Sequence, residues 1–267
     1  MEVHTHSHTA DPGIHRGRKK WTHYFWEFLM LFLAVFCGFL AENLREHYIE
    51  QQRAKELAKS LREDLRIDTA SFHMIRQIRS EKNNVIDSLL SELKNYPDSV
   101  NIPKVYQHIY DIIFKIHFKR AEGTVSQLKN SGYLRYFSKT SIPNKLMEYD
   151  RIVGNLGEFE TTYNMALDRF VYLVFQHLDA DIANKSWANR LTAVPVPANA
   201  PLYNMDKTNL NYFKYHAVSL KHLNLVSVNF FIGPAEQKAT ELIDIIQKDF
   251  HLSQRTLQRS PDGPLEK

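Results

Sequence analysis

The chain has 267 residues, of which 43% are hydrophobic and 24% are charged, a balance typical of a folded protein rather than a disordered one. The formal net charge is only +4, and four basic residues are concentrated in positions 16–20, which excludes a uniformly basic nucleic-acid-binding surface. The single cysteine, Cys37, excludes an intrachain disulfide, and the scarcity of glycine (nine residues) favours helices over β-sandwiches.

Residues 1–20 are predicted to form a flexible, His-rich, basic tail. His4, His6 and His8 alternate with small polar residues, and imidazole is a ligand for zinc, nickel and copper. Because no carboxylates hold these rings in place, we expect adventitious metal binding and no dedicated metal site.

Residues 21–44 are predicted to be a transmembrane anchor. Residues 28–41 read FLMLFLAVFCGFLA without a charge, and aromatic residues that favour the membrane interface precede them. Glu27 is the one awkward residue: it can reach the headgroups, be neutralised, or pair with His23 one turn earlier. The alternatives are a buried helix of a soluble protein and a cleaved signal peptide.

The exit from the apolar segment argues against cleavage. The run Phe39-Leu40-Ala41 places a bulky residue where a signal peptidase requires a small one, and Phe36 precedes Cys37 where a lipid-attachment site requires a small residue. A helical pattern also continues directly from Glu42. We therefore expect an uncleaved helix that runs on out of the membrane.

Orientation is predicted from charge density, because the basic residues are equal in number on the two sides. The sets are Arg16, Arg18, Lys19 and Lys20 before the span and Arg45, Arg53, Lys55 and Lys59 after it. The upstream set is the denser, and the downstream set is diluted by glutamates. The positive-inside rule then predicts a cytoplasmic N-terminus and, in a bacterium, a periplasmic soluble domain.

Residues 45–252 are predicted to form one helical-bundle domain, followed by a polar tail at 253–267. Apolar residues recur at three-, four- and seven-residue steps, which is the period of an amphipathic helix. The first pattern covers 42–96 and comprises Leu57, Leu61, Leu65, Phe72, Ile75, Ile78, Val85, Leu89 and Leu93. Further helices are predicted at 103–119, 124–132, 143–180, 207–231 and 234–252, with strand-like alternation making 207–231 the least clear.

The predicted fold class is therefore all-α, an N-terminal transmembrane helix continuing into a long helix of an antiparallel bundle. Residues 187–203 break the pattern, because Pro195, Pro197 and Pro201 favour an extended loop.

Two stretches resemble an uncharacterised bacterial family of single-pass, membrane-anchored helical proteins, known only as a domain of unknown function. One runs from Trp21 to Asp68 and includes FLAVFCGFLAENLREH; the other is LKNSGYLRYFSKTSIPNKLMEYD at 128–150. The family's elements are met here by Leu128, Lys129, Ser131, Gly132, Leu146 and Tyr149. The resemblance implies an N-terminal transmembrane helix and a helical domain, and it brings no activity and no catalytic residues.

No catalytic, cofactor-binding or metal-binding residues are predicted. The nearest approach to a metal cluster is His177, Asp179 and Asp181, which also mark a helix end. Lys129 to Gly132 could hold an anion, although a helix closed by glycine is favoured. The aromatic residues and lysines of 203–221 fit a bundle core with lysines outside, so no nucleic-acid partner is expected. His108, His117, His177, His216, His222 and His251 are dispersed without ligand spacing.

The sequence thus predicts a non-enzymatic protein of the bacterial inner membrane, with a protein-interaction, scaffold or sensor domain. Its expected partners are the lipid bilayer and either a second copy or another envelope protein. Two alternatives stay open: a small-molecule-binding or hydrolytic periplasmic domain, and a channel subunit associating through Gly38.

Overall fold

The computed structural model describes residues 21–116, 118–187 and 194–252. The tails predicted at 1–20 and 253–267 lie outside the described residues. The chain divides into two units, Met1–Gln52 and Arg53–Lys267. The fold is all-α, as predicted, and the described residues include no β-strand.

A single helix, α1 (Trp21–Glu92), covers both the apolar segment and the first amphipathic pattern. No glycine or proline occurs between Gly38 and Pro97, so nothing in the backbone interrupts the helix there. The prediction that the apolar helix continues into a long helix is confirmed.

In the first unit, the apolar part of α1 has no buried side chain among those described between Trp21 and Ala41. An 18-residue window of this helix has a mean hydropathy of 2.0 and is 0% buried. Glu27 lies 3.1 Å from His23, so the third of its predicted alternatives is the one observed. By length and composition this is a helix that could cross a membrane, and it is the one such helix among the described residues.

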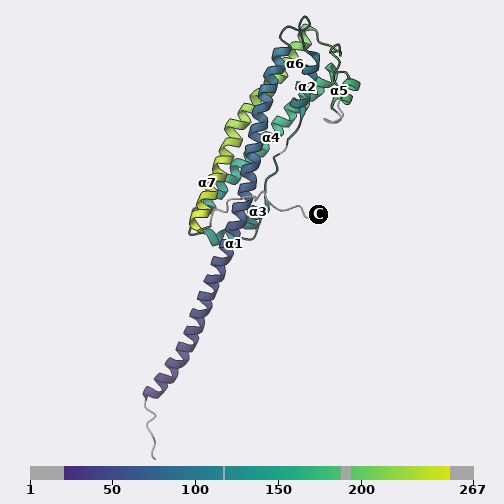
Figure 1. Ribbon diagram of the computed structural model, residues 1–267. Helices are drawn as coiled ribbons and strands as arrows, with labels where there is room; N and C mark the ends of the chain where they lie inside the picture. Colours follow the sequence, from purple (N-terminus) through teal and green to yellow (C-terminus); the bar gives the residue numbers. More distant parts are fainter. Residues whose placement is uncertain (1–20, 117, 188–193, 253–267) are drawn as a thin grey trace, which may run out of the picture. The chain divides into compact units, whose positions relative to one another are not determined.

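The second unit is a helical bundle (Figure 1), and its long described helices form four rods. The first is α1 from Arg53 onward. The second is interrupted, with α2 (Ile102–Ile113) and α3 (Gly123–Asn130) separated by a non-helical segment. The third is α4 (Ile142–His177), preceded by the 3₁₀ helix η1 (Tyr133–Phe137). The fourth joins α6 (Lys207–Val226), the π-helix η2 (Ser227–Ile232) and α7 (Gly233–Asp249).

Side-chain contacts fix the directions of the rods. Asp68 on α1 meets Tyr149 on α4, and Arg79 meets Glu160, a constant offset that makes α1 and α4 parallel. Asp87 pairs with Lys221, whereas Arg76 pairs with Glu236, so the fourth rod runs antiparallel to α1. The domain is therefore the predicted antiparallel bundle, with α1 and α4 as neighbouring long helices.

The core consists of two apolar clusters along the bundle. The first surrounds Leu89, Ile109 and Phe170, near the α2 end of the bundle. The second surrounds Phe72, Leu146 and Leu242, near the α3 end. On α1 the clusters are separated by the interval between Ile75 and Ile86, which carries the polar residues described below.

Three predicted elements need correction. The helix predicted at 103–119 ends at Ile113, because Phe114 has an extended ψ of 118°. The helices predicted at 207–231 and 234–252 are one continuous rod; Pro234 lacks an N–H, and the wide π-turn accommodates it, with Gly233 N–H donating to the Val228 carbonyl. The short helix α5 (Ala180–Trp187) was not predicted.

Candidate functional site

A layer of polar residues crosses the middle of the bundle between the two apolar clusters. Arg79, Lys82 and Asn83 contribute from α1, and Asn224 and Ser227 from the fourth rod, and all five are buried. Buried polar groups are costly unless they are partnered, so a concentration of them inside a bundle marks a candidate functional site.

Arg79 forms an ion pair with a carboxylate on α4. Its Nη2 atom donates to both carboxylate oxygens of Glu160 on α4, at 2.6 and 2.7 Å, and its guanidinium lies 4.0 Å from the centroid of the Tyr163 ring. The side chain of Arg79 is 5% exposed and that of Glu160 14%. This pair fixes the register of α1 against α4, because removing either partner would leave a buried charge alone.

The amide pair in the layer joins α1 to the fourth rod. Asn224 Nδ2 donates to Asn83 Oδ1 at 3.0 Å, one turn before the π-helix begins at Ser227. Asn224 Oδ1, Ser227 Oγ and Arg79 Nη1 are buried without a hydrogen-bond partner among the described residues. Asn224 and Ser227 lie at the start of the π-turn, and π-turns inside helices are frequent at functional sites.

Lys82 binds the C-terminal end of α2, where the second rod is interrupted. Its ammonium donates to the carbonyl of Ile112 at 3.0 Å and to that of Phe114, which are among the last carbonyls of α2. A cation at a helix C-terminus is favourable, and here it replaces the hydrogen bonds that a continuing helix would have supplied. Burial, with a further contribution from the nearby positive charge of Arg79, lowers the pKa of Lys82 to about 8.

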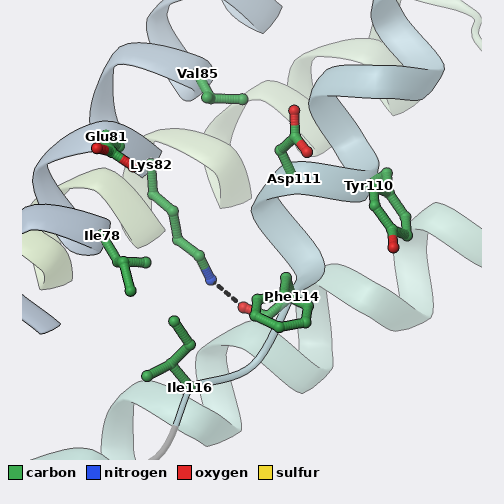
Figure 2. A pocket seen from close by; sticks show the side chains of 8 residues that line it. All are labelled: Ile78, Glu81, Lys82, Val85, Tyr110, Asp111, Phe114 and Ile116. Atoms are coloured by element: carbon green, nitrogen blue, oxygen red, sulfur yellow. Dashed lines mark hydrogen bonds between the residues drawn. The ribbon is translucent and has the colours of Figure 1, made fainter. Parts of the chain in front are cut away.

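A cleft of about 620 Å³ opens beside Lys82, between α1 and the end of α2 (Figure 2). Lys82 and Asp111 face it from opposite sides, one from α1 and one from α2. Its lining combines apolar and acidic side chains with the one lysine: Ile78, Glu81, Lys82, Val85, Tyr110, Asp111, Phe114 and Ile116. The volume lies within the range of small-molecule sites.

A second polar cluster lies nearer the α3 end and fastens the non-helical segment to the long helices. Asp68, 1% exposed, accepts from the backbone N–H of Ala121 at 2.8 Å and from the Tyr149 hydroxyl at 2.6 Å. Burial raises the pKa of Asp68, and burial together with the carboxylate of Asp68 raises the pKa of Tyr149. Asp64 accepts from the N–H of Thr124 at 2.9 Å.

Asp150 completes this cluster from the next position on α4. It pairs with Arg120 and with Lys129, each at 2.7 Å. Burial opposes ionisation of Asp150, but the hydrogen bonds from Lys129 and Arg120 outweigh it and lower the pKa. The carboxylates of this cluster all have partners in the chain and fasten the non-helical segment to the long helices, while Arg120 Nε and Nη2 are buried without a hydrogen-bond partner among the described residues. The hydrogen bond between Asp68 and Tyr149 also brings residues 21–68 and 128–150 into contact.

The clusters singled out from sequence have structural roles. Asp179 accepts from the N–H groups of Asp181 and Ile182 and from the Tyr203 hydroxyl, so it caps the start of α5. His177 contacts the carbonyl of Tyr203 at 2.9 Å through Nδ1. The described part of the chain includes no group of three His, Cys, Asp or Glu residues that could hold a metal ion.

The stretch at 129–132 is a helix end, as favoured. α3 ends at Asn130, and Gly132 has the left-handed φ of +66°. Two of the three lysines of 203–221 bind the bundle itself: Lys214 donates to the Leu93 carbonyl at 2.7 Å and Lys221 to Asp87 at 2.5 Å. His117 lies outside the described residues.

Sequence reasoning missed the layer and the cleft. A signal for them was available, because the apolar stripe of α1 skips a turn between Ile78 and Val85, where Lys82 lies on the inward face. The contact of Lys82 with α2 could not be read from that gap, since it depends on where α2 ends.

Comparison of the chain with protein-family models, with curated proteins and with solved structures gives no match.

Proposed function

We propose that this protein is a single-pass membrane protein of the bacterial cell envelope whose helical domain is a non-enzymatic protein-interaction, scaffold or sensor module. The observation that carries the proposal is the composition of α1. Its first part exposes an unbroken apolar surface that water would not tolerate, and its later part supplies buried core residues such as Leu61, Phe72 and Leu89. A bilayer is the environment that suits such an apolar surface.

The same helix motivates a sensor or scaffold role. Because α1 contributes to both units, a partner that shifts or rotates α1 in one unit would also displace the part of α1 that belongs to the other unit. In-cell crosslinking followed by mass spectrometry of the membrane-bound protein tests this role. We expect crosslinks either between copies or to one envelope protein; a strictly monomeric protein that crosslinks to nothing would refute it.

The proposed orientation places the N-terminus in the cytoplasm and the domain in the periplasm, because the basic residues at 16–20 are the denser set. A Cys37→Ser, Ser126→Cys double variant tests it, since Ser126 is exposed on α3. A membrane-impermeant maleimide should label this variant in cells with a permeabilised outer membrane. Labelling only after the inner membrane is lysed would reverse the orientation, and Cys37→Ser alone is the control.

A second candidate function is small-molecule binding by the domain. The specific observation in its favour is the cleft beside Lys82, where charged groups and apolar side chains converge. This candidate is compatible with a sensor role, because the cleft lies between α1 and the interrupted rod.

A further inference from the structure

The two buried cations of the layer, Arg79 and Lys82, have different kinds of partner. Arg79 has the carboxylate of Glu160, whereas Lys82 meets two backbone carbonyls, and no carboxylate oxygen of the described residues lies within 4.0 Å of its ammonium. The Lys82 residue is 6% exposed. A buried charge without a counter-charge is unfavourable, so an anionic group reaching Lys82 from outside would be stabilised.

The ammonium of Lys82 also retains a donor. It carries three N–H groups, and two are used by the carbonyls of Ile112 and Phe114. The cleft adjoins this ammonium, so the third N–H is available to an acceptor that enters there.

The rest of the cleft carries the opposite charge. Glu81 and Asp111 line it, and Asp111 is bound by the side-chain amide of Gln107 at 3.1 Å, a neutral partner that leaves its negative charge uncompensated. A simple anion would therefore meet two carboxylates, and a simple amine would meet Lys82. A molecule that carries both a carboxylate and an ammonium satisfies both.

Between these charges the walls are apolar. Ile78, Val85 and Ile116 lie around the stem of Lys82, and Phe114 is 58% exposed at the edge of the cleft. These surfaces suit a hydrocarbon or aromatic side chain.

We propose that the cleft binds a free amino acid with an apolar side chain, whose carboxylate accepts from Lys82 while its ammonium lies against Asp111 and Glu81. The inference deepens the small-molecule-binding candidate by naming its ligand class. Binding of a carboxylate would favour the charged form of Lys82, so affinity should fall as pH rises above about 8.

Isothermal titration calorimetry on the detergent-solubilised full chain tests the proposal with three probes. L-phenylalanine has both charges, 3-phenylpropanoate lacks the ammonium, and 2-phenylethylamine lacks the carboxylate. We expect saturable binding of L-phenylalanine and at least tenfold weaker binding of the other two. Absence of saturable binding by phenylalanine and by leucine at millimolar concentration would overturn the proposal, as would equal binding of all three probes.

Two variants locate the site. Lys82→Met should weaken phenylalanine binding at least tenfold, whereas Lys221→Met, which removes a lysine paired with Asp87 outside the cleft, should leave it unchanged. Asp111→Asn should weaken phenylalanine binding several-fold and not weaken that of 3-phenylpropanoate. Unchanged binding in both cleft variants would overturn the site.

If Lys82→Met does not fold, the three probes and Asp111→Asn decide the matter alone. These outcomes are independent of the anchoring proposal, because crosslinking and membrane extraction test that proposal without any ligand.

Discussion

Asp68 and Lys82 are two buried ionisable residues on the same face of α1, about four turns apart. Their hydrogen bonds to the rest of the chain run in opposite directions. Asp68 accepts two hydrogen bonds from the chain, and Lys82 donates two. Burial shifts both pKa values toward the neutral form, upward for Asp68 and downward for Lys82. Each residue therefore makes the stability of the domain depend on pH.

For Lys82 the pKa is about 8 in the folded chain and 10.5 in the unfolded chain. Between these values the unfolded chain binds more protons, so the contribution of Lys82 to the free energy of unfolding rises with pH, by on the order of 3 kcal/mol across the window. We expect Lys82→Met to lose this rise, because methionine has no titratable group.

Denaturant unfolding of both proteins at pH 7 and pH 10 measures the effect. The loss of the two carbonyl partners in Lys82→Met is an offset that does not depend on pH. The prediction fails if the difference in unfolding free energy between variant and parent is the same at the two pH values.

For Asp68 we expect the two neutral replacements to differ. Asp68→Ala leaves the N–H of Ala121 and the hydroxyl of Tyr149 buried without an acceptor and should cost about 3 kcal/mol. Asp68→Asn retains one oxygen for Ala121 and can donate its amide to the Tyr149 oxygen, so it should cost less than about 1 kcal/mol.

The pH dependence of Asp68 has the opposite sign to that of Lys82. Because the folded pKa is raised, the parent should lose stability relative to Asp68→Asn as pH rises from the unfolded value of 3.8. Equal destabilisation by alanine and asparagine at pH 7, measured by denaturant unfolding, would contradict the assigned hydrogen bonds.

At the scale of elements, glycine has opposite roles in α3 and α4. Gly157 lies exposed within α4, and a Cβ there would meet nothing within 4 Å, so Gly157→Ala should raise stability by about 1 kcal/mol. Gly132 has the left-handed φ of +66° after α3, so Gly132→Ala should cost roughly 1–2 kcal/mol. Thermal unfolding of the two variants beside the parent checks both signs; a stabilised Gly132→Ala variant would refute the second.

The helices themselves were predictable from apolar spacing, because burying a stripe at the helical period is what holds each rod in the bundle. The residue at which α2 ends was not predictable from that spacing. Ile116 keeps the spacing of Val105, Ile109 and Ile112, so the local pattern favours a helix that continues to 119. The helix ends at Ile113 instead, where Lys82 from α1 binds its last carbonyls, a contact between residues 30 positions apart.

The fourth rod shows the converse case. Proline is common in the first turn of a helix, so Pro234 predicts that a new helix begins there. The structure has no break between helices at this position. A π-turn accommodates the proline inside a continuous rod, and the polar layer lies beside that turn. These two departures from the sequence prediction fall at the middle of the bundle, where the candidate site lies, because each depends on contacts between distant segments; the unpredicted helix α5 lies at the α2 end.

In the molecule as a whole, the helix α1 belongs to both units. The first unit offers an exposed apolar helix and the second a bundle with a polar layer, a broken rod and a cleft. In the proposed sensor role, a ligand would bind in the helical domain and thereby change a contact between this protein and a partner at the membrane. That function rests on the claim that residues 24–41 lie in a bilayer.

Alkaline carbonate extraction of membranes from cells that express the full chain tests this claim most directly. The account predicts that the parent stays in the membrane pellet, while Leu33→Arg, Phe36→Arg, which places two charges in the apolar segment, moves to the soluble fraction. Release of the parent chain by carbonate, with the two-charge variant behaving identically, would contradict the anchor and the function built on it.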